Sequence, residues 1–314
     1  MRLVKSASFF LFCFCSHLFS YGQNRLSQGD HFAMVNGIRI HYYVRGKGPV
    51  CLLPSPGWGP SIGYLKSTLQ PLENYFKIVY YDTRMSGQSA GPADTTKYTS
   101  KDFMDDMDSL RIYLNQQKVW IMGHSAGGFQ VLNYGIHHND HLKGIIVLDG
   151  IAGEDSLRSA ELTRMVLKRI GQPYYEKGTA IIFGKDTTNY SLTQSIQYIL
   201  PFYFHDLNKM NAFLKLDVSQ MSEQAHRYTT AAGFDTEYLF PNLGEITVPT
   251  LVVVGDDDFI CDKVSQADRI VKNISSSSEM VIKNAGHFSW FENPKQFYYD
   301  CGGWLKKQGI KKKN

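Results

Sequence analysis

Short apolar runs alternate with amphipathic stretches along most of the chain. Short apolar runs bounded by turn residues are typical of buried strands, whereas apolar residues spaced three or four apart are typical of helices. The strands predicted in this way are 38–44, 50–53, 78–81, 119–122, 144–148, 250–254 and 280–282. Strands that alternate with helices predict an α/β fold, with a mostly parallel sheet covered by helices.

The clearest helical spacing lies in residues 100–115, where apolar side chains recur at Phe103, Met107, Leu110 and Leu114. This spacing places all four on one helix face. Ser100 is the expected N-cap, because a serine hydroxyl accepts hydrogen bonds from the free N–H groups of the first turn.

The alternation stops between residues 153 and 245, where the sequence is helical in character and has no buried-strand runs. It resumes with the run at 250–254, so the intervening segment is expected to be a helical cap inserted into one parent domain. The predicted organisation is a signal peptide at 1–22, an α/β core at 23–152 and 246–305, a cap at 153–245 and a basic tail at 306–314.

The first 22 residues have the features of a secretory signal peptide. Arg2 and Lys5 form a short basic region before an apolar run, and small residues precede the expected cleavage point, at Ser20 and Gly22. The apolar run is shorter than the roughly 20 residues needed to cross a bilayer. Removal and export are therefore expected, with no membrane span in the mature chain, and a retained signal anchor is the alternative.

Cysteine content and charge narrow the function classes. After removal of the signal, Cys51, Cys261 and Cys301 remain. Three cysteines do not make a disulfide framework, so they are expected to pack as small core residues, although one pair could form in an oxidising compartment. The net charge is +4, and five lysines lie in 306–314. That tail is expected to be a solvated end, and nothing indicates a nucleic-acid partner.

The segment Gly123-His124-Ser125-Ala126-Gly127 directly follows one predicted strand and precedes a helical run. The pattern Gly-x-Ser-x-Gly between a strand and a helix is the nucleophile elbow, a tight turn that exposes the serine and needs small residues two positions on either side. Ser125 is therefore the predicted nucleophile, and the N–H of Ala126 is a predicted oxyanion donor. A purely structural glycine turn is the alternative.

A catalytic acid is expected at the carboxyl end of the strand at 250–254. Three aspartates follow Gly255, and Asp258 is the predicted acid because it lies in the loop beyond the strand. Asp256 and Asp257 are predicted to bond to local backbone, and Asp262 to cap the next helix.

His287 is the predicted general base, because no other histidine follows Asp258 in the chain. His124, beside the nucleophile, is expected to be a packing and hydrogen-bonding residue. His137, His138 and His141 raise the alternative of a zinc site, which their position among polar residues at a helix end disfavours; no metal is predicted.

The second oxyanion donor should come from the loop at 54–60, whose glycines allow a close backbone approach. Pro56 has no N–H, which leaves Ser55, Gly57 or Trp58 as the donor. Gly57 and Trp58 are favoured, and an ordinary turn without a catalytic role is the alternative.

These residues resemble the α/β-hydrolase superfamily, and more narrowly its branch of prolyl aminopeptidases (proline iminopeptidases) and cap-bearing esterases. The resemblance runs from Val35 to Trp304, poorly in the cap, and includes 81–89, which is similar to that branch's D-x-R-G-x-G-x-S segment, together with 102–110 and 246–258. It implies an eight-stranded, mostly parallel sheet and no cofactor. Ser125 at the elbow disfavours the superfamily's aspartate-nucleophile members.

Two positions depart from the branch. Its His-Gly-Gly-Pro-Gly loop is replaced by the residues at 54–59, and its usual tryptophan after the serine is Ala126 here. Prolyl aminopeptidases hold the substrate amine with cap carboxylates and an aromatic wall. This cap has no tryptophan, and none of its acids can be assigned to an amine site from the sequence, including Glu154, Asp155, Glu161, Glu176 and Glu223.

The sequence therefore predicts a serine hydrolase that acts on a small ester, amide or short peptide through an acyl-enzyme intermediate. Aminopeptidase action on an N-terminal proline competes with carboxylesterase or lactonase action. A binding protein that kept the fold without activity, and a cofactor-free haloperoxidase, are the alternatives.

Overall fold

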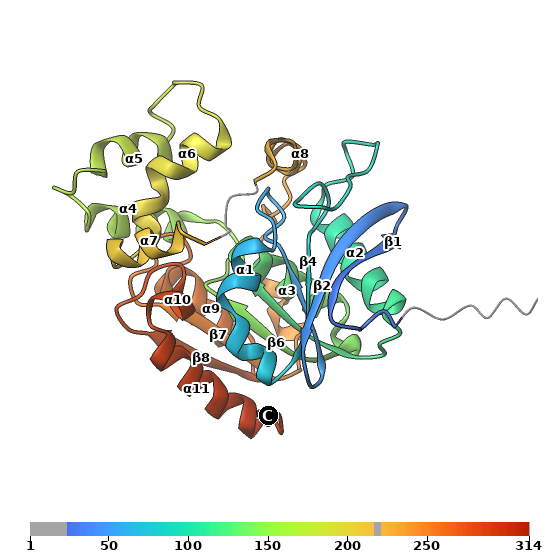
Figure 1. Cartoon of the computed structure of the whole chain (residues 1–314). Helices are drawn as coiled ribbons and strands as arrows, with labels where there is room; N and C mark the ends of the chain where they lie inside the picture. The colour runs from blue at the N-terminus through green and yellow to red at the C-terminus, as the bar shows by residue number, and fades with distance from the viewer. Residues whose placement is uncertain (1–23, 217–220, 314) are drawn as a thin grey trace, which may run out of the picture.

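The computed structural model describes residues 24–216 and 221–313. The predicted signal peptide at 1–22 lies outside the described residues. Within them, one eight-stranded sheet has the order β1-β2-β4-β3-β5-β6-β7-β8 (Figure 1). β1 and β2 are antiparallel to their neighbours, and β3 to β8 run parallel. The fold is therefore the predicted α/β type.

The strands coincide with the predicted apolar runs, with one addition. They are β1 (Gly29–Val35), β2 (Ile38–Gly46), β3 (Val50–Pro54), β4 (Lys77–Tyr81), β5 (Val119–His124), β6 (Leu142–Leu148), β7 (Thr250–Gly255) and β8 (Ser277–Ile282). β1 was not predicted. It is an edge strand with solvent on alternate positions, so it has no continuous apolar run.

Helices cover both faces of the sheet. One face carries α2 (Ser100–Tyr113), α3 (Ala126–His137) and α9 (Asp268–Asn273), and the other carries α1 (Gly63–Thr68), α10 (Ser289–Glu292) and α11 (Pro294–Lys307). Successive residues of each strand point to opposite faces. Leu52 accordingly packs in the core beneath α2 and α3, while its neighbours Cys51 and Leu53 pack in the core beneath α1 and α11.

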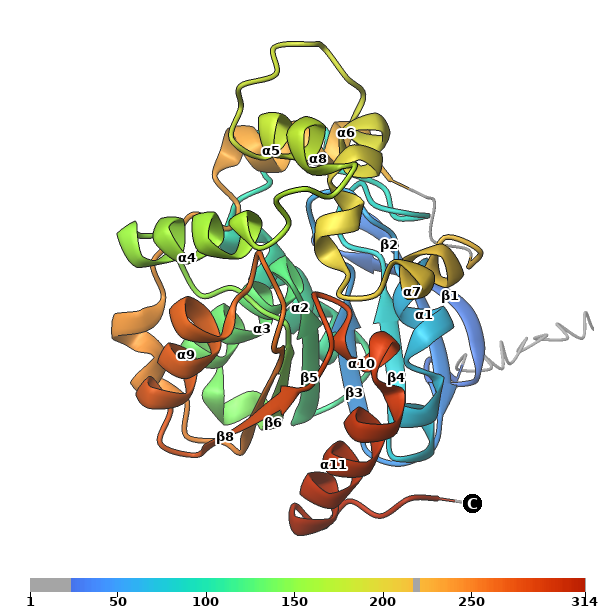
Figure 2. The ribbon, with the colours of Figure 1, turned by 90° about the vertical axis from the view of Figure 1, so that its left-hand side faces the viewer.

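Between β6 and β7 the chain leaves the core and forms a group of short helices above one end of the sheet (Figures 1 and 2). These are α4 (Ser156–Leu167), α5 (Tyr175–Ile182), α6 (Leu192–Ile199), α7 (Leu207–Phe213) and α8 (Glu223–Ala232). They lie over the carboxyl ends of the parallel strands, so these helices cover any site at those ends.

Two local predictions need correction. The N-cap of α2 is Thr99, not Ser100, because the Thr99 side chain and Asp102 form a reciprocal capping box. The tail is not a free end. Its lysine side chains are exposed, but Ile310 is buried and the Lys313 N–H donates to the Asn74 carbonyl at 2.7 Å.

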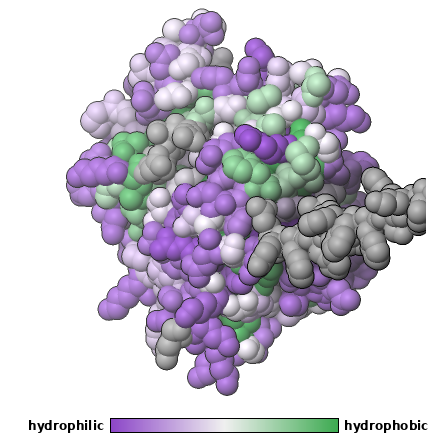
Figure 3. All heavy atoms as spheres, turned by 45° about the vertical axis from the view of Figure 1, so that its right-hand side comes forward, coloured by the Kyte–Doolittle hydropathy of each residue, from purple (hydrophilic) through white to green (hydrophobic). Residues whose placement is uncertain are grey.

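The three predicted core cysteines, Cys51, Cys261 and Cys301, are buried and free. No helix among the described residues has the length and apolar character needed to span a membrane. On the face shown in Figure 3, hydrophilic side chains predominate and the hydrophobic ones form small separate patches.

Candidate active site

Ser125 stands where β5 passes into α3. Its backbone has φ 59° and ψ −124°, a conformation that side-chain-bearing residues rarely adopt. The chain moves from β3 to β4 on one side and then returns past β3 to β5, so the sheet reverses its winding between β3 and β5. Ligands of open α/β sheets bind at such switch points, outside the carboxyl ends of the strands. Ser125 occupies that position.

The glycines around Ser125 differ in what they require. A Cβ on Gly123 would lie 2.0 Å from the Gly127 carbonyl oxygen, so only glycine fits before the serine. A Cβ on Gly127 would make ordinary contacts of 3.8 Å, whereas a Cβ on Gly128 would lie 2.7 Å from the Cα of Gly150. The steric requirement after the serine therefore falls on Gly128 and not, as predicted, on Gly127.

Asp258 and His287 are brought together from the loops after β7 and β8. Asp258 Oδ2 lies 2.8 Å from His287 Nδ1, and each residue is 1% exposed. The other carboxylate oxygen, Oδ1, accepts from the N–H groups of Ile260 and Cys261, at 2.9 and 3.1 Å. A carboxylate only accepts, so Nδ1 of the neutral ring carries the proton and Nε2 is left as the basic nitrogen.

The placement of Ser125 relative to His287 is set by His124. The His124 and His287 rings lie 4.6 Å apart, so the residue before the serine packs against the loop after β8 that carries His287 (the His287 loop). Among the described residues no hydrogen bond joins the Ser125 hydroxyl to His287. The structure thus places the predicted acid in contact with the predicted base. The predicted nucleophile directly follows His124, whose ring packs against that base.

His124 is a buried structural residue, as expected. Burial, and next the nearby His287, lower the pKa of its imidazole well below the usual value. It therefore remains neutral, and its two ring nitrogens are used in hydrogen bonds with Tyr64 and the backbone of His287.

The predicted oxyanion donors lie close to the elbow. Ser55 is excluded, because its N–H donates to the Tyr81 carbonyl at 2.9 Å. Within the described chain, no hydrogen bond uses the N–H of Gly57, Trp58 or Ala126. Gly57 has φ 98°, a conformation that suits glycine, and its loop passes the start of α3.

A cavity of about 380 Å³ lies between the core and the cap, and Ser125, Ala126 and Trp58 form part of its core side. Its cap side has an apolar portion with Leu192, Ile196 and Ile199. It also has a charged portion, with Glu154, Arg158 and Asp235. A small substrate with an apolar body and a polar or charged group suits such walls.

Of the five cap acids considered from the sequence, only Glu154 lines this cavity. Asp155 caps α4, Glu161 pairs with Arg164, Glu176 lies in the first turn of α5, and Glu223 accepts from the Leu192 N–H. Asp235, which the sequence analysis did not single out, also lines the cavity. Burial, and then the charge of Glu154, raise the pKa of Asp235.

Asp149 is a further residue that the sequence analysis missed. It follows β6, is fully buried, and accepts from the Gly255 N–H at 2.8 Å and the Ser289 hydroxyl at 2.7 Å. Burial, and next the charge of Asp258, raise its pKa well above the usual range. Through these two hydrogen bonds Asp149 connects the end of β7, which leads to Asp258, with the segment after His287. Asp149 directly follows the strand at 144–148, and this position at the carboxyl end of a strand is the sequence feature from which its place in the site could have been predicted.

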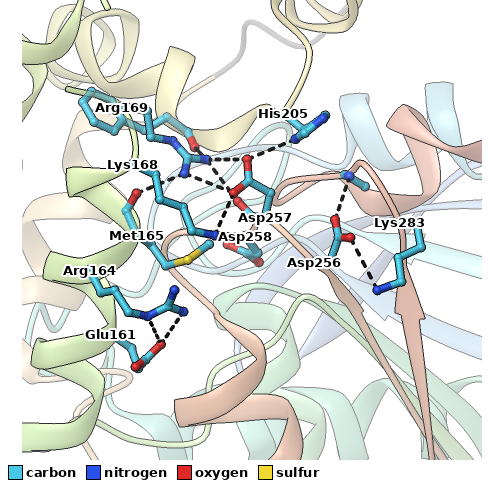
Figure 4. Close-up of polar contacts among 12 residues, drawn as sticks. Glu161, Arg164, Met165, Lys168, Arg169, His205, Asp256, Asp257, Asp258 and Lys283 are labelled. Atoms are coloured by element: carbon cyan, nitrogen blue, oxygen red, sulfur yellow. Dashed lines mark hydrogen bonds and ion pairs between the residues drawn. The ribbon is translucent and has the colours of Figure 1, made fainter. Parts of the chain in front are cut away.

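Asp257 binds the cap and not, as predicted, the local backbone. Its carboxylate contacts Arg169 at 3.2 Å, Lys168 at 3.3 Å and His205 at 3.1 Å, all from the cap (Figure 4). Asp262 does cap the next helical turn, by accepting from the Ser265 N–H at 2.8 Å.

Two clusters in the described chain have metal-ligand residue types. Asp108, His138 and His141 form one, and Asp258, Cys261 and His287 form the other. In the first, Asp108 already binds Arg111, Tyr134 and His141. In the second, Asp258 and His287 are bonded to each other. The protein's own contacts account for both arrangements.

Comparison with known proteins identifies the family of the chain. A family model described as alpha/beta hydrolase fold matches residues 54–294. A proline iminopeptidase of Saccharolobus solfataricus is 26% identical over 292 residues, which cover 85% of this chain and 89% of that protein. A soluble epoxide hydrolase of a Corynebacterium species is 26% identical over 287 residues, with 86% and 94% covered.

Solved structures share the fold. An alpha/beta fold family hydrolase from Bacillus anthracis superposes with a TM-score of 0.72 at 15% identity, covering 89% of this chain and 98% of that one. The enol-lactonase of Burkholderia xenovorans superposes with a TM-score of 0.65 at 20% identity, covering 88% and 100%.

Proposed function

Because the chain belongs to the α/β-hydrolase fold family and is a hydrolase, we propose that it cleaves a small ester or amide with Ser125 as nucleophile. The observation that carries the proposal is the buried bond of 2.8 Å between Asp258 and His287, beside a serine held on a strained turn.

In the proposed reaction the Ser125 hydroxyl attacks the substrate carbonyl while His287 Nε2 accepts its proton. This step requires a hydrogen bond between the serine hydroxyl and Nε2. Asp258 keeps the imidazole in the required tautomer and stabilises its protonated form. His287 then returns the proton to the leaving group, which departs. In the second step His287 accepts a proton from water, the water oxygen attacks the acyl carbon, and the bond to the Ser125 oxygen breaks as that oxygen takes the proton back.

Charge develops on the carbonyl oxygen during attack. The unused N–H of Ala126 at the start of α3, together with that of Gly57 or Trp58, would stabilise this charge. The positive end of the helix dipole adds to the same effect.

The proposal is tested with a fluorophosphonate probe, which reacts with activated serines. The wild type is expected to be labelled and Ser125→Ala to remain unlabelled. If the wild type is not labelled under conditions that label a control esterase, the proposal fails and a non-catalytic role remains.

A matched pair of aspartate variants tests the acid. Asp258→Asn is expected to lower kcat about 10⁴-fold, because the amide holds the ring in the wrong tautomer. Asp256→Asn is the control. Asp256 lies two residues away, and its nearest charged partner is Lys283 at 3.7 Å. If both variants retain similar activity, Asp258 is not the acid.

The acyl group is tested with a panel of short acyl esters, lactones and an arylamide of proline. The similarity to proline iminopeptidases supports the arylamide, and the apolar portion of the cavity supports the acyl esters. Cleavage of none of these substrates would remove both substrate classes.

We also propose export, with removal of residues 1–22 at the sequence features described above. The test is the mass of the purified protein from the exported fraction of producing cells. A chain beginning at Gln23 is expected, and an intact chain held in the membrane fraction would contradict the proposal.

A further inference from the structure

Arg158, on the first turn of α4, is a buried cation without adequate partners. It is 4% exposed, and its Nε and Nη1 have no hydrogen-bond acceptor. Its nearest acid is Glu154, which lies 3.6 Å from Nη2 and has a side chain 55% exposed. Burial of a guanidinium is costly unless its N–H groups meet acceptors, so this residue lowers stability where it stands.

Arg158 lies at the wall of the same cavity as Ser125. Tyr203 lines this cavity too. The Tyr203 carbonyl in turn accepts from the His287 N–H at 2.8 Å. The cation therefore belongs to the cavity that Ser125 lines and not to a remote face of the cap.

Costly buried charges persist where they serve a ligand. We propose that Arg158 binds a carboxylate of the substrate, so that the preferred substrates are esters or amides that carry a carboxylate beside the scissile bond. This inference rests on the proposed serine-hydrolase function. The substrate carboxylate would take the place of the solvent-exposed Glu154 at Nη2 and accept from one of the two unpartnered nitrogens.

The other charges in the cavity favour a carboxylate over two alternatives. A phosphate monoester would bring nearly two negative charges beside Glu154 and Asp235, whereas a carboxylate brings one. A free amine would face the buried Arg158 cation. Its attraction to Glu154 would be weak because solvent screens that exposed side chain.

Two matched substrate pairs test the inference, because the carboxylate can lie on either side of the scissile bond. The first pair is 4-nitrophenyl hydrogen glutarate and neutral 4-nitrophenyl pentanoate. The second is 4-acetoxybenzoate and its methyl ester. The wild type is expected to favour the charged member of one pair at least about 10-fold in kcat/KM, as one charge-assisted hydrogen bond allows.

Variants on one helix separate the charge from the packing. Arg158→Gln is expected to abolish the preference for the charged substrate, by lowering its kcat/KM at least about 10-fold relative to that of the neutral one, and Arg158→Lys to retain part of the preference. Arg164→Gln is the control. Arg164 lies on the same helix, its side chain is 51% exposed, and it pairs with Glu161.

The outcomes distinguish this inference from the proposed function. If the wild type shows no charged preference in either pair, or Arg158→Gln slows both members equally, the inference is wrong and the serine-hydrolase proposal stands. If Ser125 is not labelled and no ester is cleaved, the proposed function fails.

Calorimetry on the Ser125→Ala protein decides the inference in that last case. Benzoate, which carries a single carboxylate, is expected to bind to the Ser125→Ala protein at least about 10-fold more tightly than to the Ser125→Ala/Arg158→Gln protein, as loss of a charge-assisted contact implies. Equal binding would overturn the inference, and tighter binding of phenyl phosphate than of benzoate would do so too.

Discussion

His124 Nε2 lies 2.9 Å from the carbonyl oxygen of His287. A carbonyl only accepts, so Nε2 carries the proton, and Nδ1 must accept from the Tyr64 hydroxyl at 2.7 Å. Burial raises the pKa of Tyr64 well above its usual value, so that hydroxyl keeps its proton. The neutral imidazole of His124 thus connects the end of β5 to the His287 loop by a hydrogen bond.

Replacement of Tyr64 by Phe is expected to reveal this tie. The change leaves His124 Nδ1 buried without a donor, which should lower the free energy of unfolding by about 1–2 kcal/mol in urea denaturation. Tyr299→Phe, at a residue 83% exposed, is the control and should change it by less than about 0.5 kcal/mol. Equal stability of both variants would mean that Tyr64 does not donate to His124.

The steric requirement at the elbow predicts opposite results for neighbouring glycines. Gly128→Ala brings a Cβ to 2.7 Å from the Gly150 backbone. It should lower the free energy of unfolding by about 1–3 kcal/mol. Gly127→Ala meets only contacts of 3.8 Å and should fold as stably as the wild type. Thermal unfolding of the two proteins measures the difference, and the reverse order would contradict the described turn.

The contacts of Asp257 predict that it anchors the cap. Asp257→Asn should lower the free energy of unfolding by about 1–3 kcal/mol, because Arg169 is buried and loses its counter-charge. Glu161→Gln breaks the pair with the exposed Arg164 on α4 and should cost less than about 1 kcal/mol. Figure 4 shows both ion pairs. Denaturant titration compares the variants.

The effect of Asp257→Asn should depend on pH. Burial works to raise the pKa of Asp257, but the charges of Arg169 and Lys168 and the bond from His205 outweigh it and lower the pKa. Because folding lowers this pKa, the ionised carboxylate stabilises the folded state at pH values above the pKa in the unfolded chain, which is near 3.8. This stabilisation is lost as the pH falls through the pKa in the folded chain. The stability difference between wild type and variant should therefore be full at pH 7 and shrink below about pH 4.

Glu292 should act in the opposite direction. Its carboxylate accepts from the N–H groups of Gly286 and His205, at 2.7 and 2.9 Å, and burial raises its pKa to about 7. Because folding raises this pKa, the protonated side chain contributes its full stabilisation at pH values below the pKa in the unfolded chain. That contribution is lost as the pH rises through the pKa in the folded chain, about 7.

The matched variant is Glu292→Gln, which does not titrate. From pH 5 to pH 8 the wild type should lose stability relative to this variant, by on the order of 1–3 kcal/mol. Melting temperatures recorded across this range measure the change. Curves that stay parallel would show that Glu292 does not titrate there.

Most of the sheet could be predicted because buried parallel strands are apolar on both faces, as at 250–254. β1 could not, because only one face of this edge strand is buried. The cap could be recognised as a helical interruption. Its helix boundaries and its contacts with Asp257 could not, since they depend on packing against distant residues.

The site divides in the same way. The position of Ser125 on the turn between β5 and α3 could be predicted because the elbow imposes a local glycine pattern. The contact between Asp258 and His287 could be expected because each follows one of the last two strands and no later histidine is available. Arg158 and Asp235 could not be predicted. A charge on a helix face has the same sequence pattern whether it meets solvent or a cavity, and only the placement of the cap decides between these surroundings.

The docked tail determines where the chain can be modified. The segment after α11 runs at the end of the molecule opposite the cap helices (Figure 2), and its Lys313 N–H donates to the Asn74 carbonyl. An affinity tag or immobilising linker joined at this end of the described chain would lie on the side of the molecule away from the cap and its cavity. The protein could then be held on a surface by that end while the cavity stays open to solution.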